Sequence, residues 1–449
     1  MQYLYQKKNS KQHNKQHMKN IKQLGSAFLF ASFALSMSAN AADVISIYKD
    51  KPLKDSQIFL ESSGQQLKFN GTNLVTPKGD VQLQTSSKKK ASDTLRFSWK
   101  DTWYSSMTLE AAAPLNLAGM MQTGVLALDV KIDELDKGGI SFKMKCKSDN
   151  CNRVVPFTMA ARELRGKGWS KAYVPLNCFV QEQDDFSATT TPFALDVGGQ
   201  GSVSVANVEL LGNAPKNISL LECPDYKTAS TTPDMLNEWW SIDWWLPRHE
   251  QKRMEAKTIA EKGGKIDLLF IGDSITQGWE GDGAPVWQKH YAHRNAFAIG
   301  FGGDRTENVL WRLQHGAVEN MSPKVVVLMI GTNNTGHRYE NPIYTAAGIK
   351  KILQELQVRL PNSKVLMLAI FPRDEQPNGG LRLINKGVNA IIKDYADNKR
   401  VFFTDINSVF LTNEGVLPKE IMPDLLHPNE KGYSLWAEAL EPHLQKLMK

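Results

Sequence analysis

Four short blocks in the C-terminal half of the sequence carry residue types that can hydrolyse an ester. Ser274 ends a Gly-Asp-Ser segment, and His427 lies three residues after Asp424. A serine becomes a nucleophile when a base lies within hydrogen-bond reach, and a carboxylate can hold the histidine Nδ1–H so that Nε2 faces the serine. A Gly-Gly pair ending at Gly303 and a Gly-Thr-Asn segment ending at Asn333 lie between the two. The spacing and residue types predict a serine acyl hydrolase.

The negative charge that develops during ester hydrolysis needs fixed hydrogen-bond donors. We predict that the backbone N–H groups of Ser274 and Gly303 and the side-chain amide of Asn333 supply them. Each block alone has a simpler interpretation: Gly-Asp-Ser as a helix N-cap, Gly-Gly as an ordinary loop, Asp424 as a cap beside a surface histidine. Their joint order favours the catalytic interpretation. Five other histidines of this half lack so close an acidic partner and are predicted to be surface or packing residues: His249, His290, His293, His315 and His337.

The elements that must position these residues alternate between strands and helices. We predict strands at Ile266–Ile271, Val325–Ile330, Val365–Ile370 and Val401–Thr404, and helices within Trp239–Lys262 and at Ile343–Arg359, Leu381–Tyr395 and Glu430–Leu447. All-apolar strands between amphipathic helices indicate a parallel sheet covered on both faces. Ligands of such sheets bind beyond the carboxyl ends of the strands, and Ser274 follows the first strand at that edge.

The residues before this region have a different pattern. Short alternating runs such as Gly124–Ile132 and Ser202–Leu210 are separated by turn residues, with one helix-like segment near Ala160. This pattern is typical of a β-sandwich. We therefore predict a β-sandwich domain over residues 42–213, a linker over 214–238 and a catalytic domain over 239–449.

Residues 1–41 have the composition of a secretory signal peptide. They contain six lysines and no acidic residue, then an apolar stretch and an Ala39-Asn40-Ala41 cleavage site. The apolar stretch is too short to cross a bilayer permanently, although a buried N-terminal helix is the alternative. Initiation at Met18 would give a leader of ordinary length. We predict export in a bacterium, to the periplasm or the medium, without membrane insertion after cleavage.

The net charge of the chain is concentrated in this leader. Of the formal charge of +7, the six leader lysines account for 6, which leaves 7 − 6 = +1 for the remaining residues. A nearly neutral protein has no electrostatic attraction for nucleic acid or an anionic membrane. The sequence therefore predicts neither as a partner.

The chain has four cysteines, an even number that suggests disulfides in an exported protein. Cys146 and Cys151 flank a short polar turn, so we predict that they pair, which leaves Cys178 to pair with Cys223. A zinc site is the alternative, but no histidine occurs between residues 43 and 248. No metal is therefore predicted at these cysteines.

The C-terminal blocks resemble the SGNH (GDSL) hydrolase family, and within it the esterases related to platelet-activating-factor acetylhydrolase catalytic subunits. The similarity extends roughly from Trp245 to Leu447. It implies a flavodoxin-like α/β/α sheet without a cofactor. Carried over by position, it implies Ser274 as nucleophile, His427 as base with Asp424 as partner, and Gly303 and Asn333 as oxyanion donors.

The front region resembles a different family. Its Gly168-Trp169-Ser170 segment and the cysteine loop are similar to a galactose-binding-like β-sandwich of jelly-roll type, found on some bacterial glucan hydrolases, roughly over Gly64 to Leu211. The resemblance implies proximity to carbohydrate, although such modules can be purely structural. Four aromatic residues could stack on sugar rings or belong to the core, and none is assigned a binding role: Trp99, Trp103, Tyr104 and Trp169.

From these features we expect an exported carbohydrate O-acetyl esterase whose partner is an acetylated oligosaccharide or polysaccharide. The first alternative is a hydrolase of lipids or short-chain carboxyl esters, because of the acetylhydrolase resemblance. A non-catalytic carbohydrate-binding protein is the second alternative, and the complete set of catalytic residue types argues against it. The sequence leaves the glycan, the hydroxyl that carries the acetyl group and the oligomeric state open.

Overall fold

A computed structural model of the chain describes residues 44–88, 93–148 and 151–449. The predicted signal peptide, residues 1–41, lies outside the described residues. Residues Ala42–Lys449 form one compact unit, in which a β-rich region is followed by a region of alternating strands and helices. This confirms the prediction that an all-β domain precedes an α/β domain.

The β-rich region consists of antiparallel strands. Its strands are β1 (Val44–Lys49), β2 (Lys51–Pro52), β3 (Gln57–Ser62), β4 (Gln65–Lys68), β5 (Asn73–Val75), β6 (Val81–Ser86), β7 (Thr94–Glu110), β8 (Val125–Glu134), β9 (Gly138–Lys145), β10 (Asn152–Pro156), β11 (Ser170–Pro175) and β12 (Thr191–Leu211). A short helix α1 (Thr158–Leu164), predicted near Ala160, and the 3-10 helix η1 (Leu176–Phe179) complete it.

The long strands β7 and β12 pair with each other and organise this domain. The first part of β12, up to Gly199, pairs with β9, and the part after Gly201 pairs with β8. The register shifts between these parts. Gly199 has a φ of 74°, and a side chain there would collide with the backbone of Lys137. A glycine is therefore required where the strand changes partners.

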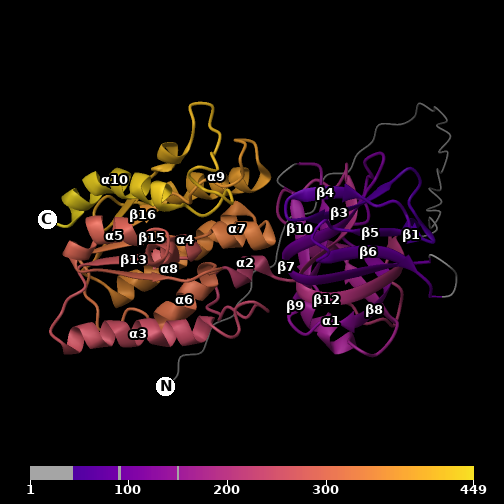
Figure 1. Ribbon diagram of the computed structural model, residues 1–449, viewed down its shortest axis with the longest axis horizontal. Helices are drawn as coiled ribbons and strands as arrows, with labels where there is room; N and C mark the ends of the chain where they lie inside the picture. The colour runs from indigo at the N-terminus through magenta and orange to yellow at the C-terminus, as the bar shows by residue number, and fades with distance from the viewer. Residues whose placement is uncertain (1–43, 89–92, 149–150) are drawn as a thin grey trace, which may run out of the picture. The chain divides into compact units, whose positions relative to one another are not determined.

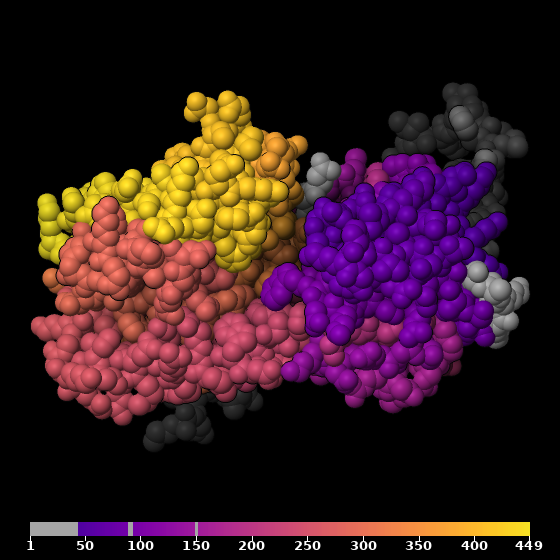
Figure 2. All heavy atoms as spheres, in the orientation of Figure 1, coloured from indigo at the N-terminus to yellow at the C-terminus, as the bar shows by residue number. Residues whose placement is uncertain are grey.

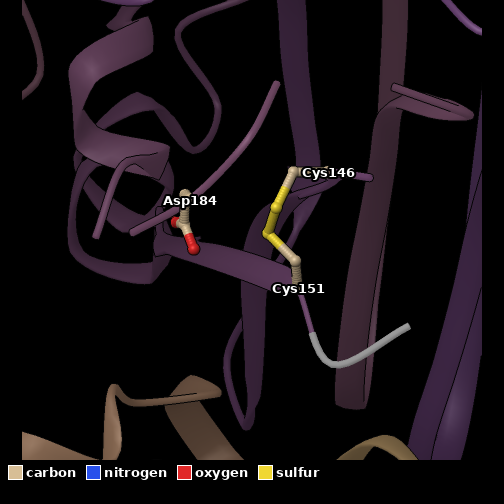
Figure 3. Close-up of side chains that lie close together, drawn as sticks. All are labelled: Cys146, Cys151 and Asp184. Carbon is tan, nitrogen blue, oxygen red and sulfur yellow. A yellow bond between two sulfur atoms is a disulfide. The ribbon is translucent and has the colours of Figure 1, made fainter. Parts of the chain in front are cut away.

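Both predicted disulfides are present, Cys146–Cys151 and Cys178–Cys223. Figure 3 shows Asp184 beside the first of them. Within the described residues, Cys146, Cys151 and Asp184 form the only group of possible metal ligands. The two sulfur atoms are bonded to each other, and the Asp184 carboxylate accepts a hydrogen bond from Arg153 Nε at 2.6 Å. These three residues therefore form no metal site.

The α/β region is built on a parallel sheet with the strand order β14-β13-β15-β16-β17 (Figure 1). The strands are β13 (Leu268–Gly272), β14 (Ala296–Gly300), β15 (Val325–Met329), β16 (Lys364–Leu368) and β17 (Val401–Thr404). Four of them lie where the sequence predicts strands, and the bounds of β17 are those predicted. The edge strand β14 was not predicted.

Both faces of this sheet are buried, as the all-apolar strands predict. Leu269 and Ile271 of β13 point into one apolar cluster, whereas Leu268 and Phe270 point into the other. Helices α3 and α6 cover the first face, and α10 covers the second (Figure 1). In Figure 2 the C-terminal residues, coloured yellow, extend over the outside of this second face.

The helices of this region are α2 (Tyr226–Ala229), α3 (Trp245–Glu261), α4 (Ser274–Gln277), α5 (Ala284–His290), α6 (Thr306–Gln314), α7 (Thr332–Arg338), α8 (Pro342–Arg359), α9 (Gly380–Ile392) and α10 (Glu430–Leu447). Four 3-10 helices are η2 (Gly278–Glu280), η3 (Ala292–Arg294), η4 (Lys393–Tyr395) and η5 (Asn407–Phe410). The predicted bounds hold for α10 and nearly for α8. No helix in the described parts of the chain is long and apolar enough to cross a membrane.

The segment predicted as a linker, residues 214–238, makes many contacts with the α/β region. Ser230 is fully buried, and its carbonyl oxygen accepts a hydrogen bond from Thr306 Oγ1 at 2.8 Å. Leu236 belongs to the apolar cluster beneath α3 and α6. The Asn308 side chain donates to the carbonyl oxygen of Asp234 at 3.0 Å. The last part of this segment is thus packed as part of the α/β region.

Candidate active site

Ser274 lies at the carboxyl end of β13, as predicted, and is the first residue of α4. The Asp273 carboxylate caps this helix by accepting a hydrogen bond from the backbone N–H of Ile275 at 3.0 Å. A side chain at Gly272 would collide with the Thr276 hydroxyl and with the carbonyl oxygen of Met329 on the next strand. The Gly-Asp-Ser segment therefore combines a strand end, a cap and an oriented serine.

Helix α10 contacts the turn that carries Ser274. The Tyr433 hydroxyl donates a hydrogen bond to the carbonyl oxygen of Ile275 at 2.7 Å. Gly278 has no room for a side chain, because this hydroxyl lies directly against it. The four-residue helix α4 is thereby fixed by tertiary contacts, since so short a helix is not stable by itself.

The predicted base lies against the predicted nucleophile. The Ser274 hydroxyl and His427 Nε2 are 2.8 Å apart, and His427 Nδ1 is 2.6 Å from Asp424 Oδ2. With Nδ1–H donating to the carboxylate, Nε2 is free to accept the serine proton. The structure thus brings together the three residues that the sequence predicts as nucleophile, base and orienting acid.

Asp424 holds both the imidazole ring and the loop that carries it. Its second oxygen, Oδ1, accepts hydrogen bonds from the backbone N–H groups of Leu426 at 3.0 Å and His427 at 2.7 Å. Partial burial acts to raise the pKa of this carboxyl, but the hydrogen bonds from His427 outweigh it and lower the pKa to about 2. Asp424 is therefore an anion at any pH at which the enzyme could work.

The glycine block lies beside α4. The Gln277 side-chain oxygen accepts a hydrogen bond from the backbone N–H of Gly302 at 2.7 Å. Gly303 has a φ of 75°, in the left-handed region, and the N–H of Asp304 donates to the carbonyl oxygen of Phe301 at 3.1 Å to close the turn. This turn fixes the orientation of the Gly303 N–H, one of the predicted oxyanion donors.

Asn333 lies in the first turn of α7, after β15, and is 5% exposed. Its side-chain nitrogen donates a hydrogen bond to the carbonyl oxygen of Asp304 at 3.0 Å. An amide nitrogen has two hydrogens, so this bond orients the group and leaves the second hydrogen for a ligand. The bond also joins the two blocks that carry Gly303 and Asn333.

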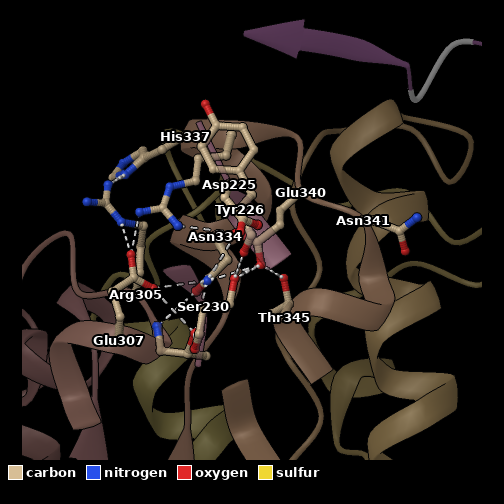
Figure 4. A network of polar contacts seen from close by, with 12 residues as sticks. Asp225, Tyr226, Ser230, Arg305, Glu307, Asn334, His337, Glu340, Asn341 and Thr345 are labelled. Atoms are coloured by element: carbon tan, nitrogen blue, oxygen red, sulfur yellow. Dashed lines mark hydrogen bonds and ion pairs between the residues drawn. The ribbon is translucent and has the colours of Figure 1, made fainter. Parts of the chain in front are cut away.

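A network of buried polar groups lies behind these two blocks (Figure 4). The Arg305 guanidinium contacts the carboxylates of Glu238 at 3.0 Å and Glu307 at 2.9 Å. It also lies 3.3 Å from His337 Nδ1. Burial, together with the neighbouring arginines, holds the pKa of His337 well below its usual value. The ring is therefore neutral and accepts the arginine hydrogen bond.

A second part of the network connects α7 to the glycine block and to the preceding segment (Figure 4). The Asn334 side-chain oxygen accepts from the backbone N–H of Thr306 at 3.0 Å. Glu340 accepts from Asn334 at 3.3 Å and from the Ser230 hydroxyl at 2.7 Å. Hydrogen bonds thus connect the segments that carry Gly303 and Asn333 on their buried side.

Asp273, the middle residue of the Gly-Asp-Ser segment, has an unusual environment. It is 1% exposed, and burial raises the pKa of its carboxyl to about 7. Its Oδ2 atom has no hydrogen-bond partner among the described residues. The carboxyl next to Ser274 in the sequence therefore has a pKa near neutral pH, in contrast to that of Asp424.

The sequence interpretation missed the residues that hold these groups. Tyr433 and Arg305 contact Ile275 and His337, which are distant in sequence, although Arg305 also contacts Glu307 two residues ahead. Gln277 contacts Gly302, 25 residues ahead, but it lies three residues after Ser274 on the same short helix. That spacing was the one available signal. Among the other histidines, His249 Nε2 contacts the carbonyl oxygen of His315 at 3.0 Å, a packing role as predicted.

Comparison with known proteins identifies both regions. A family model described as GDSL-like lipase/acylhydrolase matches residues 270–435, which include all five predicted catalytic residues. A model described as galactose-binding domain-like matches residues 57–210.

The chain matches two curated relatives over most of their lengths. The platelet-activating factor acetylhydrolase IB subunit alpha1 of Homo sapiens is 36% identical over 188 residues, which are 42% of this chain and 79% of that protein. Subunit alpha2 of Rattus norvegicus is 33% identical over 207 residues, which are 46% of this chain and 86% of that protein. The chain therefore belongs to the GDSL-like lipase/acylhydrolase family of ester hydrolases. Within that family it is a homologue of the platelet-activating factor acetylhydrolase subunits, which confirms the resemblance seen in the sequence.

Solved structures also include matches to the β-rich region. The exo-1,3/1,4-beta-glucanase of a Pseudoalteromonas species matches 42% of this chain with 23% of its own length, at 20% identity and a TM-score of 0.35. The galactose-binding-like front domain predicted from the sequence is confirmed by the family match over residues 57–210.

Proposed function

We propose that this chain is an exported esterase that removes O-acetyl groups from carbohydrates. Ser274 is the nucleophile, His427 the base, and Asp424 its orienting partner. The 2.8 Å contact between the Ser274 hydroxyl and His427 Nε2 carries this proposal, because a serine is inert toward esters without such a base.

In the first half of the reaction, Ser274 Oγ attacks the acetyl carbonyl carbon while His427 Nε2 takes the hydroxyl proton. The carbonyl oxygen becomes an oxyanion that accepts hydrogen bonds from the N–H groups of Ser274 and Gly303 and from the Asn333 amide. The intermediate then collapses, and the bond from the acetyl carbon to the sugar oxygen breaks. His427 returns its proton to that oxygen, which leaves as a sugar hydroxyl.

In the second half, a water molecule replaces the sugar. His427 takes a proton from the water, and the resulting hydroxide attacks the acetyl-enzyme carbonyl through a second oxyanion. When the bond to Ser274 Oγ breaks, the proton returns to that oxygen and acetate leaves. Asp424 remains ionised throughout, because hydrogen bonds from His427 keep the pKa of its carboxyl near 2, and it stabilises each imidazolium that forms.

Two further features support an acetylated sugar as the substrate. The relatives are named acetylhydrolases, which favours acetyl as the acyl group. The front domain is galactose-binding domain-like, and the leader-like residues 1–41 favour export, where polysaccharides are encountered. The second candidate is the hydrolysis of lipid esters, which the names of the same relatives favour.

The experiment measures acetate release by the purified protein from partially acetylated oligosaccharides and from short and long p-nitrophenyl esters. We expect acetylated sugars and p-nitrophenyl acetate to be cleaved, and Ser274→Ala to lower kcat by roughly 10⁴-fold or more. Ser408→Ala, which changes an exposed serine of η5, is the matched control and should retain full activity.

Undiminished turnover by Ser274→Ala would refute the triad, whereas no turnover of any ester by the unaltered protein would restore the non-catalytic alternative. Faster cleavage of long-chain esters than of acetyl esters, with no release from acetylated sugars, would instead establish the lipid candidate.

A further inference from the structure

Two tryptophan side chains lie directly on the glycine block of the candidate site. A side chain added at Gly303 would collide with the indole of Trp240, and one added at Gly302 would lie 3.4 Å from the indole of Trp244. Both indoles are only partly buried. A flat apolar surface therefore borders the N–H group that we assign to the oxyanion.

These two tryptophans belong to the segment before α3, outside the region that the hydrolase family model matches. The Trp244 indole N–H donates to the carbonyl oxygen of Trp240 at 2.7 Å. Their rings stack with centroids 6.4 Å apart at an interplanar angle of 25°, and His337 meets Trp240 edge-on at 5.9 Å. Because the His337 ring is neutral, it places no charge beside the indole of Trp240.

The aromatic surface continues to a solvent-exposed tryptophan. The ring of Trp103, in β7, lies 5.5 Å from that of Trp240 and 6.1 Å from that of Trp239, at angles of 48° and 53°. Trp103 is 69% exposed. Trp99, which precedes Trp103 in the same strand, is by contrast buried in the core of the β-rich region. An exposed indole that continues a surface beside a reaction centre is typical of a binding site.

We propose that Trp103, Trp239, Trp240 and Trp244, the aromatic row, bind the pyranose rings of the acetylated glycan. This inference rests on the proposed function and assigns its substrate subsite. A pyranose ring presents C–H groups on its faces and hydroxyls on its rim, so it packs on an indole while its hydroxyls remain in water. An acyl chain needs enclosure from water, which a ring as exposed as Trp103 does not offer.

The row also gives the β-rich region a role in substrate binding. Trp103 comes from this region, whereas Trp240 lies on Gly303 of the hydrolase region. A sugar ring that rests on Trp103 and Trp240 places its neighbour, with the acetyl group, at Ser274. The row therefore acts on the sugar part of the substrate and leaves the acetyl chemistry unchanged.

The test compares two substrates that carry the same acetyl group. Partially acetylated xylo-oligosaccharides contain sugar rings, whereas ethyl acetate has no ring to stack. We expect Trp103→Ala to raise KM for the oligosaccharides roughly five- to tenfold, with kcat unchanged, and to leave turnover of ethyl acetate unchanged. Trp103→Phe, which keeps an aromatic ring, should recover most of the affinity. Because Trp103 is exposed, its replacement leaves the core intact.

The matched control is Trp169→Ala, which removes a partly exposed indole of the same region that instead packs against the Lys88 ammonium. It should leave both substrates unaffected. Equal losses with both substrates in Trp103→Ala would overturn the aromatic row, as would a loss confined to long-chain esters. If the unaltered protein releases acetate from ethyl acetate but from no acetylated sugar, the proposed function itself fails. The two failures are thus distinguishable.

Discussion

The two halves of the candidate site are built in opposite ways. The nucleophile half consists of strand ends and helix starts in the protein interior, where Asp273 is 1% and Asn333 5% exposed. The base half is a surface loop, in which the His427 and Asp424 side chains are 41% and 56% exposed. The first half is rigid because the surrounding core fixes it. The second keeps its shape because one carboxylate binds both the ring and the loop backbone.

Asp273 and Asp424 show how these two environments change the pKa of the same kind of side chain. Burial raises the pKa of Asp273 to about 7, whereas hydrogen bonds from His427 lower the pKa of Asp424 to about 2 against the opposing effect of partial burial. Asp424 is thus a permanent anion that can stabilise an imidazolium. Asp273 is a structural cap whose charge depends on pH.

After the loss expected for Ser274→Ala, the largest expected effect tests the half of the site that carries His427. In Asp424→Asn, one side-chain oxygen must still accept the backbone N–H groups of Leu426 and His427, so the amide nitrogen faces the ring. His427 Nδ1 then becomes an acceptor, and Nε2 carries the proton and cannot take the one from Ser274. We expect kcat to fall roughly 10³-fold with KM little changed, measured on p-nitrophenyl acetate. A loss below tenfold would show that the imidazole is oriented by other groups.

The next effect tests the nucleophile half. Asn333→Ala removes an oxyanion donor and the hydrogen bond to the Asp304 carbonyl oxygen. We expect kcat to fall roughly 10²- to 10³-fold with the fold retained, judged by steady-state kinetics and circular dichroism. Asn413→Ala, in an exposed loop, is the matched control. Equal activity in the two variants would remove Asn333 from the site.

The smallest effect concerns stability and sharpens the contrast between the aspartates. Because the pKa of Asp273 is higher in the folded state than the unfolded value near 3.9, the folded protein binds more protons between about pH 4 and 7. The free energy of unfolding therefore decreases as the pH rises through this range. Asp273→Asn keeps the cap on Ile275 without ionising, so its advantage over the unaltered protein should grow by up to about 4 kcal/mol between pH 4 and 8.

Urea denaturation at the two pH values measures this difference. Asp405→Asn is the control, because Asp405 is exposed and also accepts a hydrogen bond from a backbone N–H two residues ahead, that of Asn407. A difference that is the same at both pH values would show that Asp273 does not titrate in this range.

Much of the fold could be predicted because its signal is local. Strand β17 and helix α10 have their predicted bounds, since a buried strand is a continuous apolar run and an amphipathic helix repeats every 3.6 residues. Strand β14 was missed because its sequence, Ala-Phe-Ala-Ile-Gly, is short and rich in alanine and glycine. Helix α3 begins at Trp245 and not at Trp239, because the Ser241 hydroxyl bonds to backbone groups of the preceding turn.

Ser274, Asn333, Asp424 and His427 could be named from the sequence because each follows a predicted strand or precedes a predicted helix, whereas Gly303 follows the missed strand β14 and was named from its Gly-Gly block. The supporting groups could not. Ser230 lies in a segment whose Pro, Ser and Thr content predicts a linker, yet its hydroxyl is satisfied by Glu340, 110 residues away. Trp240 likewise lies on Gly303 through tertiary packing alone. The composition of a segment indicates how polar it is. The hydrogen-bond partners of its polar groups depend on the fold.

The Cys178–Cys223 bond has a consequence for what proteolysis does to the protein. It encloses a sequence separation of 45 residues and connects the β-rich region to the segment that leads into the hydrolase region. A protease that cuts the backbone anywhere between these two cysteines leaves the fragments covalently attached. Such a nicked molecule migrates as one band in a denaturing gel until a reducing agent is added.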